Sequence, residues 1–216
     1  MKLRPTLAAA LLLLGSLAAA DTKPLRVAMI FDDGPDPVQT PRLLAIFAAE
    51  QVHVTFGTEA KNAEANPALI KSVVAAGHEL ANHSFSHKHP KGLTEAEFEA
   101  EIVGAEEKIR LAADFAPKWY WPPFLEIDDN VRAYAAKAGL RIYAPRKLAV
   151  SGDYMPNVGA EEILRRATTG IEDGTVILFH EWRPETVAQI KAVITALKQQ
   201  GCTFVTFSEM DAQLGR

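Results

Sequence analysis

The chain has 216 residues, a formal net charge of −4 and one cysteine. A mildly acidic balance without any basic block argues against nucleic acid as a partner, and a single cysteine excludes an internal disulfide. Cys202 lies in an apolar segment, where a buried small hydrophobic side chain is expected.

The first 20 residues have the three parts of a secretory signal peptide. Lys2 and Arg4 form a basic head, an apolar stretch follows over residues 7–14, and small residues lead up to Ala20. The apolar stretch is shorter than the ~20 residues that span a bilayer, so an uncleaved anchor is the weaker interpretation. We predict cleavage near Ala20, export to the periplasm or the medium, and no stable membrane insertion.

The remainder, residues 21–216, is predicted to form a single domain. It carries 21 basic and 27 acidic side chains, and its net charge is therefore −6. We expect it to be a monomer.

Strand-like and helix-like segments alternate along this domain. Apolar, β-branched and aromatic runs predict strands over residues 25–31, 52–57, 78–83, 118–124, 140–144, 175–180 and 202–207. Helical composition predicts helices over residues 40–51, 66–76, 94–113, 128–138, 160–168 and 184–200. This alternation predicts an α/β fold with a mostly parallel sheet, either a barrel or a doubly wound sheet.

The helix over residues 94–113 is the longest that the sequence predicts. Thr94 at its start and Glu97 three residues later predict a capping box. Its glutamates are expected to form a solvated face: Glu95, Glu97, Glu99, Glu101, Glu106 and Glu107.

Polar side chains collect where the predicted strands end. Asp32 and Asp33 follow the first strand, His83 ends the third, and His180 ends the strand over residues 175–180. A later extended segment reaches Asp153. Sites in parallel α/β folds are built at the carboxyl ends of strands, so these residues are candidates for one site.

Two of the histidines, His83 and His87, are four residues apart. On a helical turn this spacing places both imidazoles on one face, although such pairs are more often solvated than metal-bound. A carboxylate from Asp32 or Asp33 would complete a His-His-carboxylate set with open positions for water.

In its motifs the chain resembles the polysaccharide deacetylase family, that is, the NodB-homology domain or carbohydrate esterase family four. The matching segments are FDDGP (residues 31–35), GHELANHSFSH (77–87), WPPF (121–124), SGDY (151–154) and LFH (178–180). The C-terminal KQQGCTFVTFSEM is also similar to the family's usual ending. These segments occur in the family's order and cover nearly the whole predicted domain.

The resemblance implies a distorted (β/α) barrel with mostly parallel strands. It also implies a divalent metal, usually Zn²⁺ and sometimes Co²⁺ or Ni²⁺, bound by Asp33, His83 and His87. It assigns Asp32 as the catalytic base and His180 as the general acid. Asp153 would hold His180 in its charged form, and the backbone N–H near Phe124 would hold an oxyanion. Tyr154 and Leu178 match positions that line the pocket for the acetyl methyl group.

One departure from the family pattern concerns the base. The family usually has Arg before the two prolines, where this chain has Trp121, so Asp32 lacks that cationic support and its pKa is expected to rise. Arg146 and Arg183 are possible substitutes.

Trp182 offers an aromatic face to a sugar ring, or packs at the rim. The side chains expected to contact substrate are therefore Trp121, Pro123, Phe124, Tyr154, Leu178 and Trp182.

The predicted function is metal-dependent removal of acetyl groups from an acetylated glycan. The sequence leaves open which glycan it is, and whether the bond is an N-acetyl amide or an O-acetyl ester. Two alternatives remain: a metal-containing glycan-binding protein with weakened catalysis, and a hydrolase of small cyclic amides. Asp32 and His180 argue against the first, because binding alone requires neither side chain.

Overall fold

The computed structural model describes residues 24–215, so the predicted signal peptide and its cleavage site lie outside the described residues. The strands are β1 (Leu25–Gly34), β2 (Thr55–Thr58), β3 (Glu79–Asn82), β4 (Trp119–Tyr120), β5 (Arg141–Ile142), β6 (Lys147–Val150), β7 (Thr175–His180) and β8 (Cys202–Phe204). The α-helices are α1 (Gln39–Glu50), α2 (Ala60–Ala65), α3 (Pro67–Ala75), α4 (Glu95–Phe98), α5 (Ala105–Ala113), α6 (Asp129–Lys137), α7 (Ala160–Thr168), α8 (Pro184–Gln199) and α9 (Phe207–Leu214).

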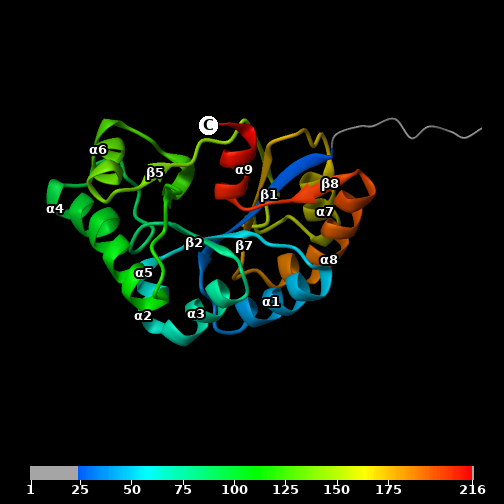
Figure 1. Ribbon diagram of the computed structural model, residues 1–216, viewed down its shortest axis with the longest axis horizontal. Helices are drawn as coiled ribbons and strands as arrows, with labels where there is room; N and C mark the ends of the chain where they lie inside the picture. Colours follow the sequence, from blue (N-terminus) through cyan, green and yellow to red (C-terminus); the bar gives the residue numbers. More distant parts are fainter. Residues whose placement is uncertain (1–23, 216) are drawn as a thin grey trace, which may run out of the picture.

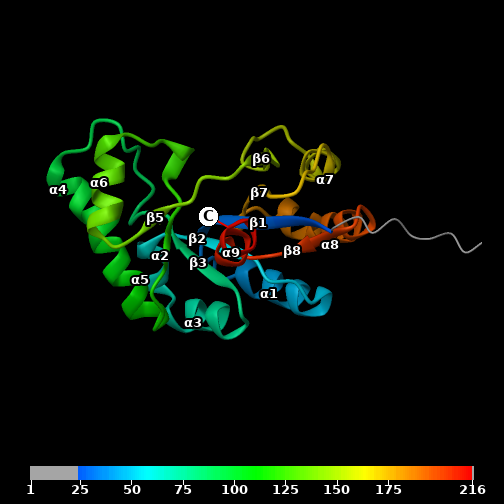
Figure 2. The ribbon, with the colours of Figure 1, turned by 45° about the horizontal axis from the view of Figure 1, so that its top comes forward.

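All strand pairs are parallel, in the order β5-β4-β3-β2-β1-β7-β6, and β8 pairs with the start of β1. Among the described strands this path has two ends, β5 and β6, that are not paired with each other. The sheet is therefore an open half-barrel instead of a closed barrel. Figure 2 shows α4 and α6 grouped at the β5 end, with α7 and α8 near β6 and β8. This confirms the predicted distorted (β/α) barrel with parallel strands.

The central strand β1 divides its side chains between two cores. Val27, Met29 and Phe31 belong to the larger core under the outer helices. Ala28 and Ile30 face the inner side of the sheet, in a second cluster. This period-two alternation is what a strand buried on both faces requires.

The inner cluster is covered by α9, which lies across β1 and β2 from α1 and α3 (Figure 1). Phe207 and Met210 of α9 are fully buried. The sequence prediction missed this helix because it extended the last strand to residue 207. A local signal was present, since Thr206 and Glu209 form a capping box.

The long predicted helix over residues 94–113 is interrupted. Its capping box at Thr94 and Glu97 is confirmed, but a π-helical turn, η1 (Glu99–Gly104), lies between α4 and α5. Within that turn Glu101 is only 4% exposed, so the prediction that it is solvated is wrong. A π-turn shifts the register of a helix face, and such insertions often occur at functional sites.

Two further features concern the single thiol and membrane insertion. Cys202 is a free, buried thiol, as predicted. Over residues 24–215 no helix has the length and apolar character that a bilayer crossing requires.

Candidate functional site

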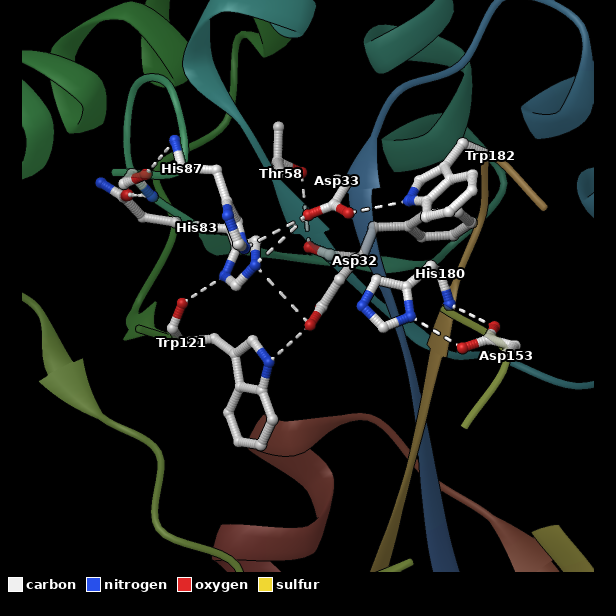
Figure 3. A network of polar contacts seen from close by, with 12 residues as sticks. Asp32, Asp33, Thr58, His83, His87, Trp121, Asp153, His180 and Trp182 are labelled. Atoms are coloured by element: carbon white, nitrogen blue, oxygen red, sulfur yellow. Dashed lines mark hydrogen bonds and ion pairs between the residues drawn. The ribbon is translucent and has the colours of Figure 1, made fainter. Parts of the chain in front are cut away.

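The carboxyl ends of the strands surround one cavity of about 410 Å³. β1, β3 and β7 each end at its wall, and the loops after β4 and β6 complete it. It is lined by Asp32, Asp33, His83, His87, Pro122, Phe124, Leu125, Val150, Tyr154, Leu178, His180 and Trp182. The cavity thus brings together five of the six residues predicted to be catalytic or metal-binding, and the sixth, Asp153, lies directly behind His180 (Figure 3).

The adjacent carboxyl groups of Asp32 and Asp33 reach the same cavity because β1 is irregular at its end. Asp32 continues the inward series of Ala28 and Ile30, so alternation alone would turn Asp33 to the opposite face. The β1–β2 register shifts between Asp32 and Gly34, and Asp33 has a positive φ of 72°. A bulge of this kind re-aims one side chain.

The turn after Asp33 is also packed closely. An ideal Cβ on Gly34 would lie 1.0 Å from Oε1 of Glu181. Glycine is therefore required at this position by the neighbouring side chain.

Three groups could hold a metal ion. Single ligand atoms of Asp33, His83 and His87 all lie within 4.8 Å of one another. Nε2 of each histidine is 3.6 Å from Oδ1 of Asp33. Oδ1 of Asp33 and Nε2 of His83 are buried without a hydrogen-bond partner among the described residues. Two orphaned ligand atoms that face each other are what a cation site requires, so these residues fit a divalent metal.

The two histidines are held in the neutral form that metal binding needs. Burial lowers the pKa of His83 to about 4 and also lowers the pKa of His87. Nδ1 of His83 bonds the Trp121 carbonyl oxygen; a carbonyl only accepts, so Nδ1 carries the proton and Nε2 presents its lone pair to the cavity. The His87 backbone N–H donates to Oγ of Ser84 at 2.9 Å.

Asp32 is 3% exposed, and its environment disfavours charge. Burial, above all, raises its pKa well above the usual value, and the nearby charge of His180 only partly offsets this. Trp121 Nε1 donates to Oδ2 at 2.9 Å, while Oδ1 has no partner among the described residues. Trp121 therefore gives Asp32 a neutral hydrogen-bond donor at the sequence position where the resemblance predicts a cationic arginine.

His180 and Asp153 form a second unit. Nδ1 of His180 lies 2.8 Å from Oδ1 of Asp153, and the His180 backbone N–H donates to Oδ2 at 2.8 Å. Burial lowers the pKa of His180, but the bond to Asp153 and the charges of Asp32, Asp153 and Asp33 outweigh it, so the net shift is upward. His180 is thus poised to carry a proton.

The residues predicted to contact substrate divide into two groups. Phe124, Tyr154, Leu178 and Trp182 line the cavity. Trp121 and Pro123 are buried and do not line it, and the Trp121 indole points to Asp32, to which it donates a hydrogen bond. Pro122 takes the lining position instead.

The possible arginine substitutes do not support the base. Arg183 stacks over the Trp182 ring, with Cζ 5.3 Å from its centroid. Arg146 packs against Gly174, and its charge contributes to the lowered pKa of Asp173.

Sequence reasoning missed the residues that support the site from behind. Glu101, from the π-helical turn, accepts from the backbone N–H and the Oγ of Ser86, at 2.8 and 2.6 Å. It thereby fastens the loop between His83 and His87. A local signal was present, because Glu101 stands three residues after Phe98 and four before Ala105, which are both buried, and this spacing places it on the apolar face of the helix.

A second supporting carboxyl group follows His180 directly. Glu181 is fully buried and accepts from Oγ1 of Thr40. Burial raises its pKa to about 8, so it is protonated at neutral pH. It joins the end of β7 to the start of α1.

The chain is similar in sequence and in fold to several known proteins. A family model described as polysaccharide deacetylase matches residues 19–143. A peptidoglycan-N-acetylglucosamine deacetylase of Bacillus cereus is 30% identical over 85% of this chain and 87% of its own length. A chitooligosaccharide deacetylase of Sinorhizobium fredii is 30% identical over 81% of this chain and 86% of its own. A family 4 acetyl xylan esterase structure from Clostridium thermocellum, in complex with a cobalt ion, has a TM-score of 0.80 at 30% identity and covers 88% of this chain and 92% of that one.

Proposed function

We propose that this chain, which belongs to the polysaccharide deacetylase family, is a metal-dependent hydrolase that removes acetyl groups from an N-acetylated glycan. One observation carries the proposal. A set of three metal-ligand atoms, a buried carboxyl group and a histidine paired with a carboxyl group all meet at a single cavity. The relatives' names include both N-acetyl and O-acetyl substrates, so the experiment tests amide and ester bonds side by side.

Asp33, His83 and His87 would hold the cation, for which we propose Zn²⁺, with Co²⁺ or Ni²⁺ as functional replacements. A divalent ion bound there would polarise the acetyl carbonyl group and acidify a water molecule. Its charge would also lower the pKa of Asp32, which the protein alone raises.

The protein's own groups would then move the protons. Asp32 accepts the proton of the attacking water as general base. The backbone N–H near Phe124 holds the developing oxyanion. His180, kept protonated by Asp153, donates to the departing amine. Leu178 and Tyr154 supply an apolar wall for the acetyl methyl group.

The decisive experiment measures acetate released by the purified protein, loaded with Zn²⁺ or Co²⁺, from a panel of N- and O-acetylated oligosaccharides. The panel contains chitin oligomers, peptidoglycan fragments, an exopolysaccharide fragment and acetyl-xylan. We expect acetate from at least one N-acetylated member. No acetate from any member, with the metal shown to be bound, would contradict the proposal and favour a glycan-binding protein.

Asp32→Asn separates catalysis from binding in the same assay. We expect turnover to fall about 10²- to 10⁴-fold, the usual contribution of a general base, with glycan affinity retained. Asp129→Asn, on the exposed first turn of α6, is the matched control and should leave turnover unchanged.

We also propose that the mature protein is exported as a monomer after cleavage near Ala20. The leader-like composition of residues 1–20 supports export. N-terminal sequencing of the protein from the expressing cell's periplasm or medium tests the cleavage position, and sedimentation analysis tests the monomer.

A further inference from the structure

Trp182 makes a contact that its predicted role at the substrate surface does not explain. Its indole Nε1 donates to Oδ2 of Asp33 at 2.8 Å (Figure 3). The other oxygen, Oδ1, is the buried orphan that faces His83 and His87. The two oxygens of one carboxyl group therefore have separate partners: the indole on one side and the ligand histidines on the other.

Asp33 needs such support more than the other two ligands do. His83 is oriented by the Trp121 carbonyl oxygen, and the backbone of His87 is held by Ser84. Asp33 lies on the bulge at the end of β1, and its side chain is 19% exposed. Among residues 24–215, Trp182 provides its carboxyl group with a hydrogen-bond donor from across the cavity.

Trp182 is itself held in place. It follows Glu181, which is buried against Gly34 and Thr40. On its other side the guanidinium group of Arg183 lies over its ring. The residue before Trp182 thus packs against the end of β1 and the start of α1, next to Asp33, while 40% of Trp182 stays exposed at the cavity.

We propose that Trp182 is a positioning residue for the metal ligand Asp33. The indole N–H holds Oδ2 and leaves Oδ1 as the single oxygen for the cation. Without this bond the carboxyl group is free to rotate, and a metal ligand that loses its outer hydrogen bond commonly binds the metal 10- to 100-fold more weakly. This inference rests on the proposed metal-dependent function of the same site.

The test separates the N–H group of Trp182 from its aromatic face. Trp182→Phe keeps a ring and loses the donor, whereas Trp182→Gln keeps a donor and loses the ring. Metal-free protein is titrated with Co²⁺ and followed by calorimetry and by the visible absorption of the ion, which reports its coordination. Zn²⁺ affinity is measured in parallel by competition with a chelator.

We expect Trp182→Phe to weaken Co²⁺ binding about 10-fold or more and to change the visible spectrum. Trp182→Gln should bind the ion closer to the wild-type affinity and should instead raise KM for the glycan. The matched control is Trp119→Phe, which removes an indole bond to Ser208 Oγ of 3.0 Å outside the cavity. It should leave Co²⁺ affinity and spectrum unchanged.

Wild-type affinity and spectrum in Trp182→Phe would overturn the inference, as would equal weakening in Trp119→Phe. Wild-type protein that binds no Co²⁺ would overturn both this inference and the metal-dependent function. Wild-type protein that binds Co²⁺ but releases no acetate would remove only the proposed function, because the Trp182 variants are still judged by metal affinity.

Discussion

Asp32 and Asp153 are two carboxyl groups buried to nearly the same degree, on opposite sides of His180. Asp153 accepts three hydrogen bonds, two from His180 and one from Thr186 Oγ1 at 2.7 Å. Asp32 accepts one from Trp121, and its other oxygen has no partner among the described residues. Equal burial thus produces opposite electrostatic states, because donors surround one group and not the other.

The pKa values follow this difference. Burial raises the pKa of Asp153, but the bonds from His180 and Thr186 outweigh it, and the net shift is downward. The pKa of Asp32 is raised well above its usual value, chiefly by burial. In the proposed mechanism the acid, His180 with Asp153, is therefore complete within the protein, whereas the base, Asp32, depends on a cation at Asp33 for its charge.

The largest expected effect comes from the same substitution at both positions, measured as the thermal stability of metal-free protein. Asp153→Asn replaces one carboxyl oxygen by an NH2 group, so one of the donors that Asp153 serves is left without an acceptor. This costs about 1.5–3 kcal/mol. For a domain of this size that lowers Tm by roughly 3–12 °C. Asp32→Asn still accepts from Trp121 and has no carboxyl group whose ionisation is opposed by burial, so it should raise Tm at neutral pH.

The pH dependence of these variants has opposite signs. The folded pKa of Asp32 lies above its unfolded value, so its ionisation costs stability as pH rises, and the gain in Asp32→Asn should vanish in acid. The folded pKa of Asp153 lies below its unfolded value, so its stabilisation is present at neutral pH and is lost as pH falls. Calorimetry from about pH 2 to pH 8 checks both, because the Asp153 contribution is lost only below its unfolded pKa. A Tm shift of the same sign in both variants at neutral pH would contradict the opposite pKa shifts of the two carboxyl groups.

A smaller effect should appear in the pH profile of turnover. Trp121→Phe removes the donor to Asp32, and a hydrogen bond to a charged group contributes about 1.5–3 kcal/mol. The acid limb of the profile should move up by about 1–2 pH units, because the base must be ionised to act. The alkaline limb, set by His180, should stay in place.

Asp153→Asn provides the converse measurement. It removes the main influence that raises the pKa of His180, so the alkaline limb should move down while the acid limb stays. If Trp121→Phe moved both limbs together, the base and the acid would not titrate as separate units.

The smallest expected effect is on the loop between the metal-binding histidines. Glu101→Gln keeps one oxygen acceptor for Ser86 and loses the other, at a cost of about 1 kcal/mol. We expect a few-fold loss of Co²⁺ affinity by titration of metal-free protein. Glu99→Gln is the control, because Glu99 lies in the same turn, is only partly buried and bonds Lys137 instead of the histidine loop. Equal affinity in wild type and Glu101→Gln would show that the loop holds the histidines without this carboxyl group.

Local pattern was sufficient for much of the architecture. Helices α1, α6, α7 and α8 lie within a residue or two of their predicted bounds, because apolar periodicity and end signals are local properties. The capping box at Thr94 was also predictable from neighbouring residues alone. The predictions failed where the backbone departs from a regular period, as at η1, or where two elements meet within a few residues, as at α9.

The amino-acid sequence was enough to predict the parallel α/β fold and to single out the polar residues near the strand ends: Asp32, Asp33, His83, His87 and His180. Spacing along the chain carries that information, since strand ends in a parallel sheet share one edge. The tertiary structure alone decided how each group is held. Trp121 lies under Asp32, Trp182 lies against Asp33, and Glu101 lies behind the histidine loop. These contacts join residues that are not neighbours in the chain, and the contact of Trp182 also depends on the bulge that turns Asp33 toward the cavity.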